Sequence, residues 1–231
     1  MKNKWVGEFC AEVIGTFILV FFGCGVVATA VITGAQSGLW QVAVVWGFGI
    51  SLAIYATSAI SGAHINPAVT IAIALYRRDK FSAKKILPYI SAQLLGGFLG
   101  AAVLYILFRG SIIYFETSHH LVRGEAGSQL SAMIFGEYFP NPAIYGITKE
   151  SFAQVSLWNA CLAEMIGTAF LLFFVFALTD KKNPNVPRGE SQLFAFFIGF
   201  TVTTHKIGEK LYPGSNNAKY FTVGVIPLIR E

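Results

Sequence analysis

Residues 61–70 read SGAHINPAVT, and this stretch decides how the chain folds. Asparagine is favoured as the N-cap of a helix and proline at its first position, so a helix is predicted to begin at Asn66-Pro67. The apolar run Pro67–Tyr76 has ten residues, too few to cross a hydrocarbon core of about 30 Å. We therefore predict a re-entrant half-helix at residues 66–77, with its N-terminus at the bilayer midplane.

The rest of the sequence is typical of a membrane protein. Of the 231 residues, 55% are hydrophobic and 13% are charged. This charged share is about half that of an average soluble domain. The predicted fold class is an all-α membrane protein, with spans at five apolar runs. These runs are Val6–Thr33, Val42–Ile60, Ile86–Phe108, Val155–Thr179 and the shorter Leu193–Thr204.

Basic residues near the ends of these runs predict the orientation. Lysine and arginine close to a span are retained on the cytoplasmic side. They cluster at residues 2–4, 77–85 and 181–188, which all fall on one side if the N-terminus is cytoplasmic. We therefore predict an inner or plasma membrane protein with a cytoplasmic N-terminus and an external loop at residues 109–154. This orientation accounts for the net charge of +5, so no nucleic-acid partner is expected.

An internal repeat relates the first span to the fourth. Residues 10–22, CAEVIGTFILVFF, and residues 162–174, LAEMIGTAFLLFF, agree at eight of thirteen positions. Because three spans separate the two copies, they cross the membrane in opposite directions, an arrangement that places a pathway between the repeats. The predicted units are 1–108 (three spans and the half-helix), 109–154 (external loop), 155–204 (a partial second repeat of two spans) and 205–231 (a tail without a sixth span).

Each copy of the repeat has a glutamate inside a span, Glu12 or Glu164. A carboxylate there costs about 2.5–3.5 kcal/mol, so each glutamate needs partners. We expect each to accept hydrogen bonds from the backbone of a buried, non-helical loop; a proton-relay pair or plain interface residues are the alternatives. Residues 62–65 would be such a loop, and its carbonyls require a water-filled cavity.

The stretch SGAHINPAVT resembles the first signature of the major intrinsic proteins, the aquaporin and glycerol facilitator family. The segments AEVIGTFILVFFG, VVWGFG and AEMIGT resemble its first, second and fourth spans. HHLVRG (119–124) and VPRG (186–189) resemble loop signatures of its glycerol-conducting branch. The resemblance covers residues 5–204. It implies an aquaporin-like inverted-repeat bundle, a homotetramer without cofactors, that passes glycerol, water and other small neutral solutes.

The resemblance also implies roles for individual residues. Asn66 would donate its side-chain amide to the permeating molecule, while Pro67 and Ala68 fix the half-helix. Trp46 would face the carbon backbone of a polyol at the constriction; from spacing alone, a lipid-facing or interfacial tryptophan is the alternative. The implied line of hydrogen-bond acceptors consists of the carbonyls of Gly62, Ala63 and His64.

A second Asn-Pro-Ala motif stands at residues 141–143, inside the predicted external loop. The two copies of the repeat are 152 residues apart, which places the counterpart of Asn66 near position 218. We therefore interpret residues 141–143 as a turn and not as the second pore motif.

Near position 218 the chain has Asn216, Ala218 and Lys219, which could be a degenerate copy of the family's second motif. The residues that remain are too few for both a half-helix and a span of about 20 residues. From the sequence we favour a foreign tail from about residue 205, produced by a frameshift or truncation, over a member that has diverged in its last quarter.

The sequence favours a passive channel whose partners are a small neutral solute and the lipid bilayer. It has no nucleotide motif, metal-ligand cluster or catalytic triad, so neither an enzyme nor a metal site is expected. A secondary transporter is the first alternative, because transporters also use inverted repeats and broken helices. A nonconducting, truncated product is the second.

Overall fold

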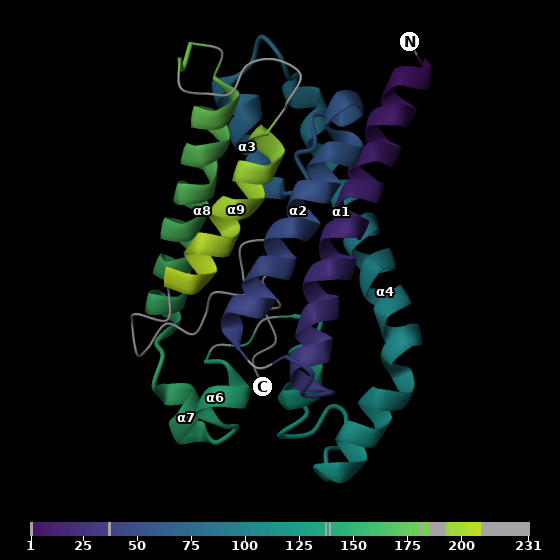
Figure 1. The fold of residues 1–231 in the computed structure, drawn as a ribbon, viewed down its shortest axis with the longest axis vertical. Coiled ribbons are helices and arrows are strands. Elements are labelled where there is room, and N and C mark those ends of the chain that lie inside the picture. Colours follow the sequence, from purple (N-terminus) through teal and green to yellow (C-terminus); the bar gives the residue numbers. More distant parts are fainter. Residues whose placement is uncertain are drawn as a thin grey trace.

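The computed structural model describes residues 2–36, 38–136, 138, 140–180, 182–184 and 193–208. Within these ranges the chain is helical and has no strand. Figure 1 shows a bundle of long helices with short helices gathered at one end. The elements are α1 (Lys2–Val31), α2 (Leu39–Ser61), α3 (Pro67–Tyr76), the 3-10 helix η1 (Ala83–Lys85), α4 (Ile86–Ser118), α5 (Gln129–Ala132), α6 (Pro142–Tyr145), α7 (Lys149–Ala153), α8 (Leu157–Thr179) and α9 (Phe194–Gly208).

Four of the described helices, α1, α2, α4 and α8, are long and apolar enough to cross a membrane. Helix α3 has the ten residues that the sequence predicts for the half-helix. Helix α9 has 15 residues, or roughly 22 Å, and is therefore shorter than a hydrocarbon core of about 30 Å. The prediction of an all-α membrane protein is confirmed.

Helix α4 continues to Ser118, past Phe108, where the apolar run ends. No proline interrupts this extension, and its last turn is tied to the loop that follows. Glu116 accepts hydrogen bonds from the guanidinium of Arg123 and from the Ser131 hydroxyl at 2.8–3.0 Å. The apolar run ends at Phe108, but the helix continues to Ser118 because the contacts of Glu116 stabilise its last turn.

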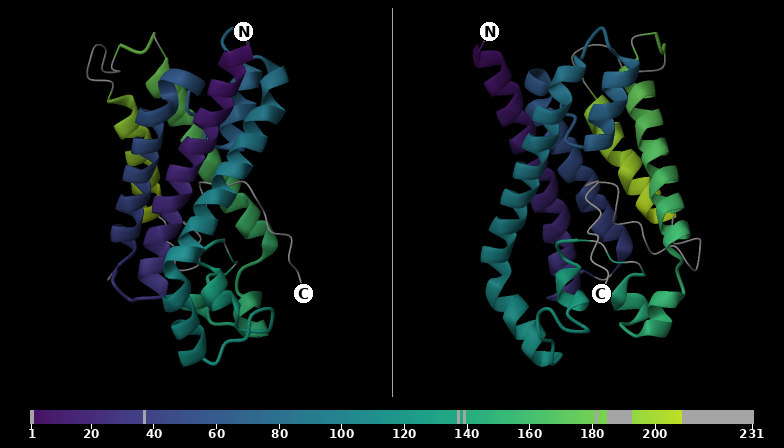
Figure 2. Two further views of the ribbon diagram at one scale, coloured as in Figure 1. Left: turned by 90° about the vertical axis from the view of Figure 1, so that its right-hand side faces the viewer. Right: turned by 180° about the vertical axis from the view of Figure 1, so that it is seen from behind.

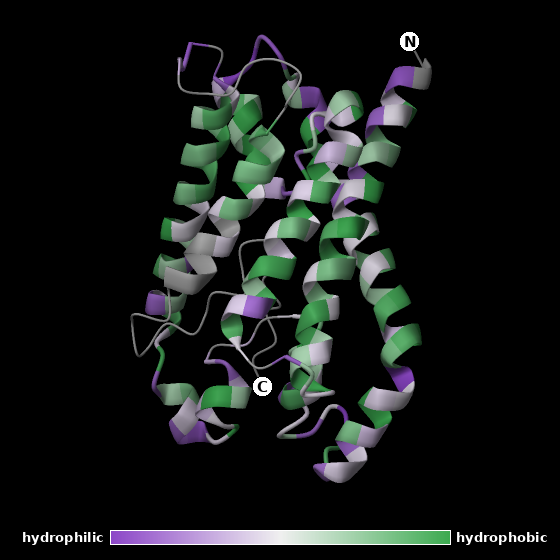
Figure 3. Ribbon diagram, viewed as in Figure 1, coloured by the Kyte–Doolittle hydropathy of each residue, from purple (hydrophilic) through white to green (hydrophobic). Residues whose placement is uncertain are grey.

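The hydropathy of the surface agrees with insertion in a bilayer. Figure 3 shows apolar residues along the long helices and hydrophilic residues at both ends of the bundle. Large apolar side chains are exposed on the outer faces, for example Phe98 (70%), Ile106 (71%) and Met165 (62%). Outward-facing apolar residues at this density indicate contact with lipid rather than water.

The two ends of the bundle differ in charge. The N-terminus, the connection from α3 to α4 and the end of α8 lie at one end, and α6 and α7 lie at the other (Figure 1). We call these the basic end and the loop end. Because α1 starts and α8 finishes at the basic end, the two copies of the repeat run in opposite directions. Basic residues described at the basic end are Lys4, Arg77, Arg78, Lys80, Lys84, Lys85 and Lys182.

The helices close into a ring. Helix α1 packs against α2 and α4, α2 also packs against α9, and α9 packs against α8. Helix α3 completes the ring because it contacts both α8 and α4. Figure 2 shows from two further sides that α3 occupies only the half of the ring at the basic end.

Glycine allows the close approach of α1 and α4. A β-carbon at Gly96 would overlap the carbonyl of Val13, and one at Gly100 would lie 3.1 Å from the carbonyl oxygen of Phe17. Small residues spaced four apart let membrane helices pack backbone to backbone. This contact positions α4 against the residues of α1 that reach the site described below.

Replacing Gly96 with alanine is expected to destabilise the protein by about 1–3 kcal/mol, because the backbones of α1 and α4 must move apart. Thermal unfolding in detergent measures the effect. Gly110→Ala on the same helix is the control, since a β-carbon there meets no atom within 4 Å. Equal melting temperatures for the two variants would contradict this account of the contact.

Candidate solute conduit

The loop between α2 and α3 has an unusual backbone. Gly62 ends α2 with a φ of 89°, and the non-glycine residues Ala63 (φ 49°) and Ile65 (φ 42°) also have positive φ. A left-handed conformation costs about 1–3 kcal/mol at such residues, most of all at a β-branched one. The loop therefore keeps this shape only if the surrounding structure holds it.

Glu12 holds the loop from α1. Its carboxylate, which is fully buried, accepts hydrogen bonds from the backbone N–H of His64 at 2.9 Å and of Ile65 at 2.8 Å. It also accepts from the Ser61 hydroxyl at 2.6 Å, and that hydroxyl in turn accepts from the N–H of Ala63 at 3.0 Å. Every N–H of residues 63–65 is thereby satisfied without a helix.

A second layer of polar side chains from α3 and α4 supports this carboxylate. Gln93 donates from Nε2 to Glu12 Oε2 at 2.8 Å and to Thr70 Oγ1 at 2.9 Å. The Thr70 hydroxyl donates to the carbonyl of Asn66 at 3.0 Å. Gln93 therefore joins α1, α3 and α4 in one network beneath the loop.

Tyr89 fixes the other side of the loop. Its hydroxyl donates to the carbonyl of Ser61 at 2.9 Å, and its ring lies 4.9 Å from the His64 ring, which also packs against Phe81. Tyr89 and Gln93 are not among the residues predicted from the sequence. The available signal was a lone amide in an apolar run, with a tyrosine one helical turn earlier on the same face.

Replacing Gln93 with leucine is expected to lower the free energy of unfolding by about 1–3 kcal/mol, because a buried acceptor on Glu12 loses its donor. Denaturation in mixed micelles measures the change. Leu94→Ala, at a half-exposed neighbouring position on the outer face, is the control. A Gln93→Leu variant as stable as wild type would show that the amide is not needed to hold the network.

The carbonyl oxygens of the same loop, unlike its N–H groups, have no partner among the described residues. No described residue donates a hydrogen bond to the carbonyl oxygens of Gly62, Ala63 or His64. Ala63 and His64 are buried, whereas Gly62 is exposed. At membrane depth a carbonyl without a protein partner requires water or a polar ligand. The described residues therefore leave these three oxygens open to a molecule inside the bundle.

Asn66 begins the half-helix beside these carbonyls. Its side-chain oxygen accepts from the N–H groups of Ala68 at 2.8 Å and Val69 at 3.3 Å, and Pro67 occupies the first helical position. This cap turns the oxygen toward the helix and the amide nitrogen away from it. The N-terminus of α3 has an effective charge of roughly +0.5.

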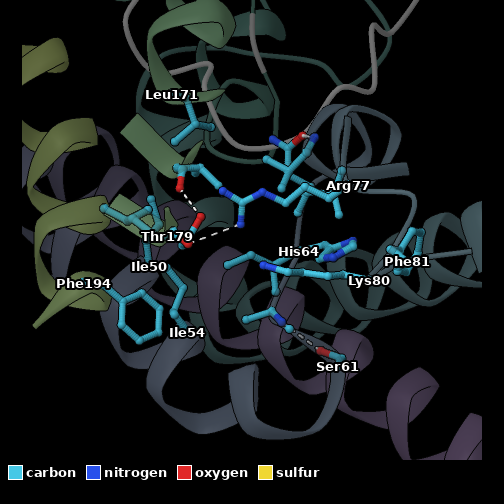
Figure 4. Close-up of a pocket in the computed structure, with 18 of the residues that line it drawn as sticks. Ile50, Ile54, Ser61, His64, Arg77, Lys80, Phe81, Leu171, Thr179 and Phe194 are labelled. Atoms are coloured by element: carbon cyan, nitrogen blue, oxygen red, sulfur yellow. Dashed lines mark hydrogen bonds between the residues drawn. The ribbon is translucent and has the colours of Figure 1, made fainter. Parts of the chain in front are cut away.

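A cavity of about 270 Å³ lies inside the ring, between residues 61–66 and the basic end. One wall is the polar loop with Asn66. The opposite walls are apolar and come from α1, α2, α8 and α9, through Leu19, Ile50, Ile54, Leu171, Val175 and Ile198. Figure 4 shows Ile50, Ile54 and Leu171 across from His64, with Arg77 and Lys80 on the same side as His64. The cavity thus offers hydrogen-bond acceptors on one side and hydrocarbon on the other.

Trp46 lies on α2 one turn from the cavity-lining Ile50, but it does not line the cavity itself. Its side chain is only 4% exposed, so it does not face lipid. Its ring packs against Gly23 of α1, where a β-carbon would overlap it. Trp46 is therefore buried between α2 and α1, on the loop-end side of Ile50.

The remaining predicted residues lie apart from the cavity. Glu164 is half-buried on α8, at the position that matches Glu12 in the repeat. The segment that it would hold by analogy contains Asn216, Ala218 and Lys219, and these lie outside the described residues. Residues 141–143 begin the four-residue helix α6 at the loop end. No group of His, Cys, Asp or Glu that could hold a metal ion occurs in the part of the chain that the structure describes.

A ring of membrane helices around a cavity that is polar on one side defines a channel for small solutes. The family model of the major intrinsic proteins matches residues 1–226. The match extends past residue 204, into the segment that the sequence analysis treats as a foreign or diverged tail. The chain belongs to the major intrinsic protein family and is an integral membrane protein.

The chain is also similar to individual members of this family. It is 43% identical to a glycerol uptake facilitator protein of Haemophilus influenzae, over 92% of this chain and 72% of the relative. It is 43% identical to a propanediol uptake facilitator of Salmonella typhimurium, over 87% and 70% respectively. The structure superposes on the X-ray structure of the aquaglyceroporin from Plasmodium falciparum with a TM-score of 0.64 and 25% identity, covering 94% of this chain and 80% of the other.

Proposed function

We propose that the protein is a passive channel for glycerol and other small neutral solutes, including water. The observation that supports this most is the two-sided cavity, lined on one side by Gly62, Ala63, His64 and Asn66 and on the other by apolar side chains. No described residue donates a hydrogen bond to the carbonyls of Gly62, Ala63 or His64. A polyol has hydroxyls along one edge and carbon along the other, so it matches both walls at once. The relatives named for glycerol and propanediol uptake point to the same class of solute.

The proposed roles follow this geometry. Asn66 donates from its amide nitrogen to a passing hydroxyl, and the carbonyls of Gly62, Ala63 and His64 accept from successive hydroxyls. Trp46 forms the apolar side of a constriction nearer the loop end. Glu12 and Glu164 hold the two loops of the repeat. Permeation by this route needs no covalent step.

We further propose that the basic end faces the cytoplasm, because lysine and arginine are retained there. The full protein is proposed to be a homotetramer with one conduit in each subunit. Asn216, Ala218 and Lys219 are proposed as the counterpart of the first motif in the second repeat.

Reconstitution into proteoliposomes tests the function. Vesicles that contain the full chain, shrunk in a glycerol gradient, are expected to recover volume faster than empty vesicles. The rate is expected to rise linearly with glycerol concentration and to have a low activation energy. Saturable uptake that depends on an ion gradient would instead indicate a secondary transporter, and a rate equal to that of empty vesicles would contradict conduction.

A further inference from the structure

Arg77 lies at the mouth of the cavity at the basic end, and its backbone is fixed on both sides. Its N–H donates to the carbonyl of Ile73 at 2.8 Å and so ends α3. Its own carbonyl accepts from the N–H groups of Lys80 at 2.9 Å and Phe81 at 3.1 Å. The residue is therefore part of a tight turn and not of a free loop.

The side chain of Arg77 crosses from α3 to α8. The guanidinium donates to the carbonyls of Phe176 at 3.2 Å and Thr179 at 3.5 Å, and it lies 5.0 Å from the centroid of the Phe176 ring. The last carbonyls of a helix have no partner within the helix, and they attract cations. Figure 4 shows Arg77 and Thr179 beside each other on the cavity wall.

Among the described residues, no acid forms an ion pair with Arg77. Lys80, which lines the same mouth, adds a second positive charge. Asp79 and Asp180 lie at the same end of the bundle, but neither lines the cavity. A solute that enters from this end therefore meets positive charge at the mouth and again at the N-terminus of α3.

We infer that Arg77 selects the solutes that pass the basic end of the conduit, where its charge repels cations and its bulk limits solute width. The inference rests on the proposed function, because it requires that solutes traverse this cavity. It assigns a second selective position at the opposite end of the cavity from Asn66. Arg77 acts here by direct contact with the solute path and also by joining α3 to α8.

Guanidinium and urea test the charge, because they have nearly the same size and shape and only guanidinium is charged. In proteoliposomes, Arg77→Met is expected to raise the ratio of guanidinium to urea permeability roughly tenfold, the effect of one unit charge a few ångströms away at a protein–water boundary. Arg77→Lys, which keeps the charge, is expected to leave this ratio unchanged. Both variants lose the hydrogen bonds of the guanidinium, so a merely structural role of Arg77 would change the ratio equally in Arg77→Met and Arg77→Lys.

Polyols of increasing length test whether the size of the Arg77 side chain limits the width of the solutes that pass. Arg77→Ala is expected to raise the permeability to a five-carbon polyol several-fold relative to glycerol, and more than Arg77→Met does. Arg78→Ala is the matched control, since Arg78 is exposed and does not line the cavity, and within the described part of the chain its side chain donates to the carbonyl of Leu75 alone. This control is expected to match wild type in both ratios.

The outcomes separate the two proposals. If wild-type vesicles pass glycerol no faster than empty ones, the proposed function fails. If wild type conducts but both ratios stay at the wild-type value in Arg77→Met and Arg77→Ala, the assignment of Arg77 is overturned while the channel remains. Should Arg77→Ala fail to fold, the comparison of Arg77→Met with Arg77→Lys decides the matter alone.

Discussion

Replacing Glu12 with leucine is expected to abolish glycerol permeation and to destabilise the protein by about 2–6 kcal/mol. The estimate counts two orphaned backbone donors, on His64 and Ile65, at about 1–3 kcal/mol each. The strained residues Ala63 and Ile65 would also lose the contacts that hold them at positive φ. The loop is therefore expected to relax, and its carbonyls would no longer form a row along the cavity.

Glu12→Gln gives a graded version of the same test. A glutamine amide has only one acceptor oxygen, so whichever way it turns, the N–H of His64 or of Ile65 faces another donor. We expect at least a tenfold lower glycerol permeability, together with a lower melting temperature. Glu125→Gln, at an exposed position beyond α4, is the control. A Glu12→Gln variant that conducts and melts like wild type would contradict the role given to this carboxylate.

The second large effect is expected at Asn66. Asn66→Ala removes both the helix cap, worth about 1 kcal/mol, and the donor beside the carbonyls, so glycerol permeability is expected to fall at least tenfold. Asn66→Asp keeps a good cap but places a negative charge at the inner end of the cavity. This variant is expected to be destabilised by burial of the new carboxylate and not by loss of the cap, and to raise the ratio of guanidinium to urea permeability. For Asn66→Ala, the melting temperature in detergent reports the loss of the helix cap, and glycerol flux in vesicles reports the loss of the amide donor.

The chain contains its own control for this experiment. Asn141 caps helix α6 in the same way, since its side-chain oxygen accepts from the N–H of Ala143 at 3.0 Å, but it lies at the loop end. Asn141→Ala is expected to cost a similar amount of stability and to leave glycerol flux intact. Equal losses of flux in Asn66→Ala and Asn141→Ala would mean that the cap, and not the position in the cavity, matters.

The sequence predicts the parts of this structure that follow local rules. Asn66-Pro67 sets the start of α3 through capping chemistry, and the ten apolar residues set its length. Glu12 could be singled out because a carboxylate in a span has few explanations. Residues 61–65 are far from Glu12 in the sequence, but a buried carboxylate needs nearby hydrogen-bond donors. The N–H groups of a non-helical loop could therefore be predicted as its partners.

The remaining features depend on packing that no local pattern encodes. Gln93 reaches Glu12 only because Gly96 brings α4 against α1, and Arg77 reaches Thr179 only because α3 lies beside α8. The extension of α4 beyond Phe108 likewise depends on the contacts of Glu116 with a loop that comes later in the chain. These are tertiary contacts, so the sequence shows the residues but not their partners.

The central claim is that solutes cross the membrane through the cavity beside α3. Two tryptophan variants of this helix test it: Ile73 lines the cavity, whereas Ile71 is 43% exposed and does not line it. With equal amounts of folded protein in proteoliposomes, Ile73→Trp is expected to reduce glycerol-driven swelling to the rate of empty vesicles, while Ile71→Trp keeps the wild-type rate. Wild-type swelling in the Ile73→Trp variant would show that the solute takes another path.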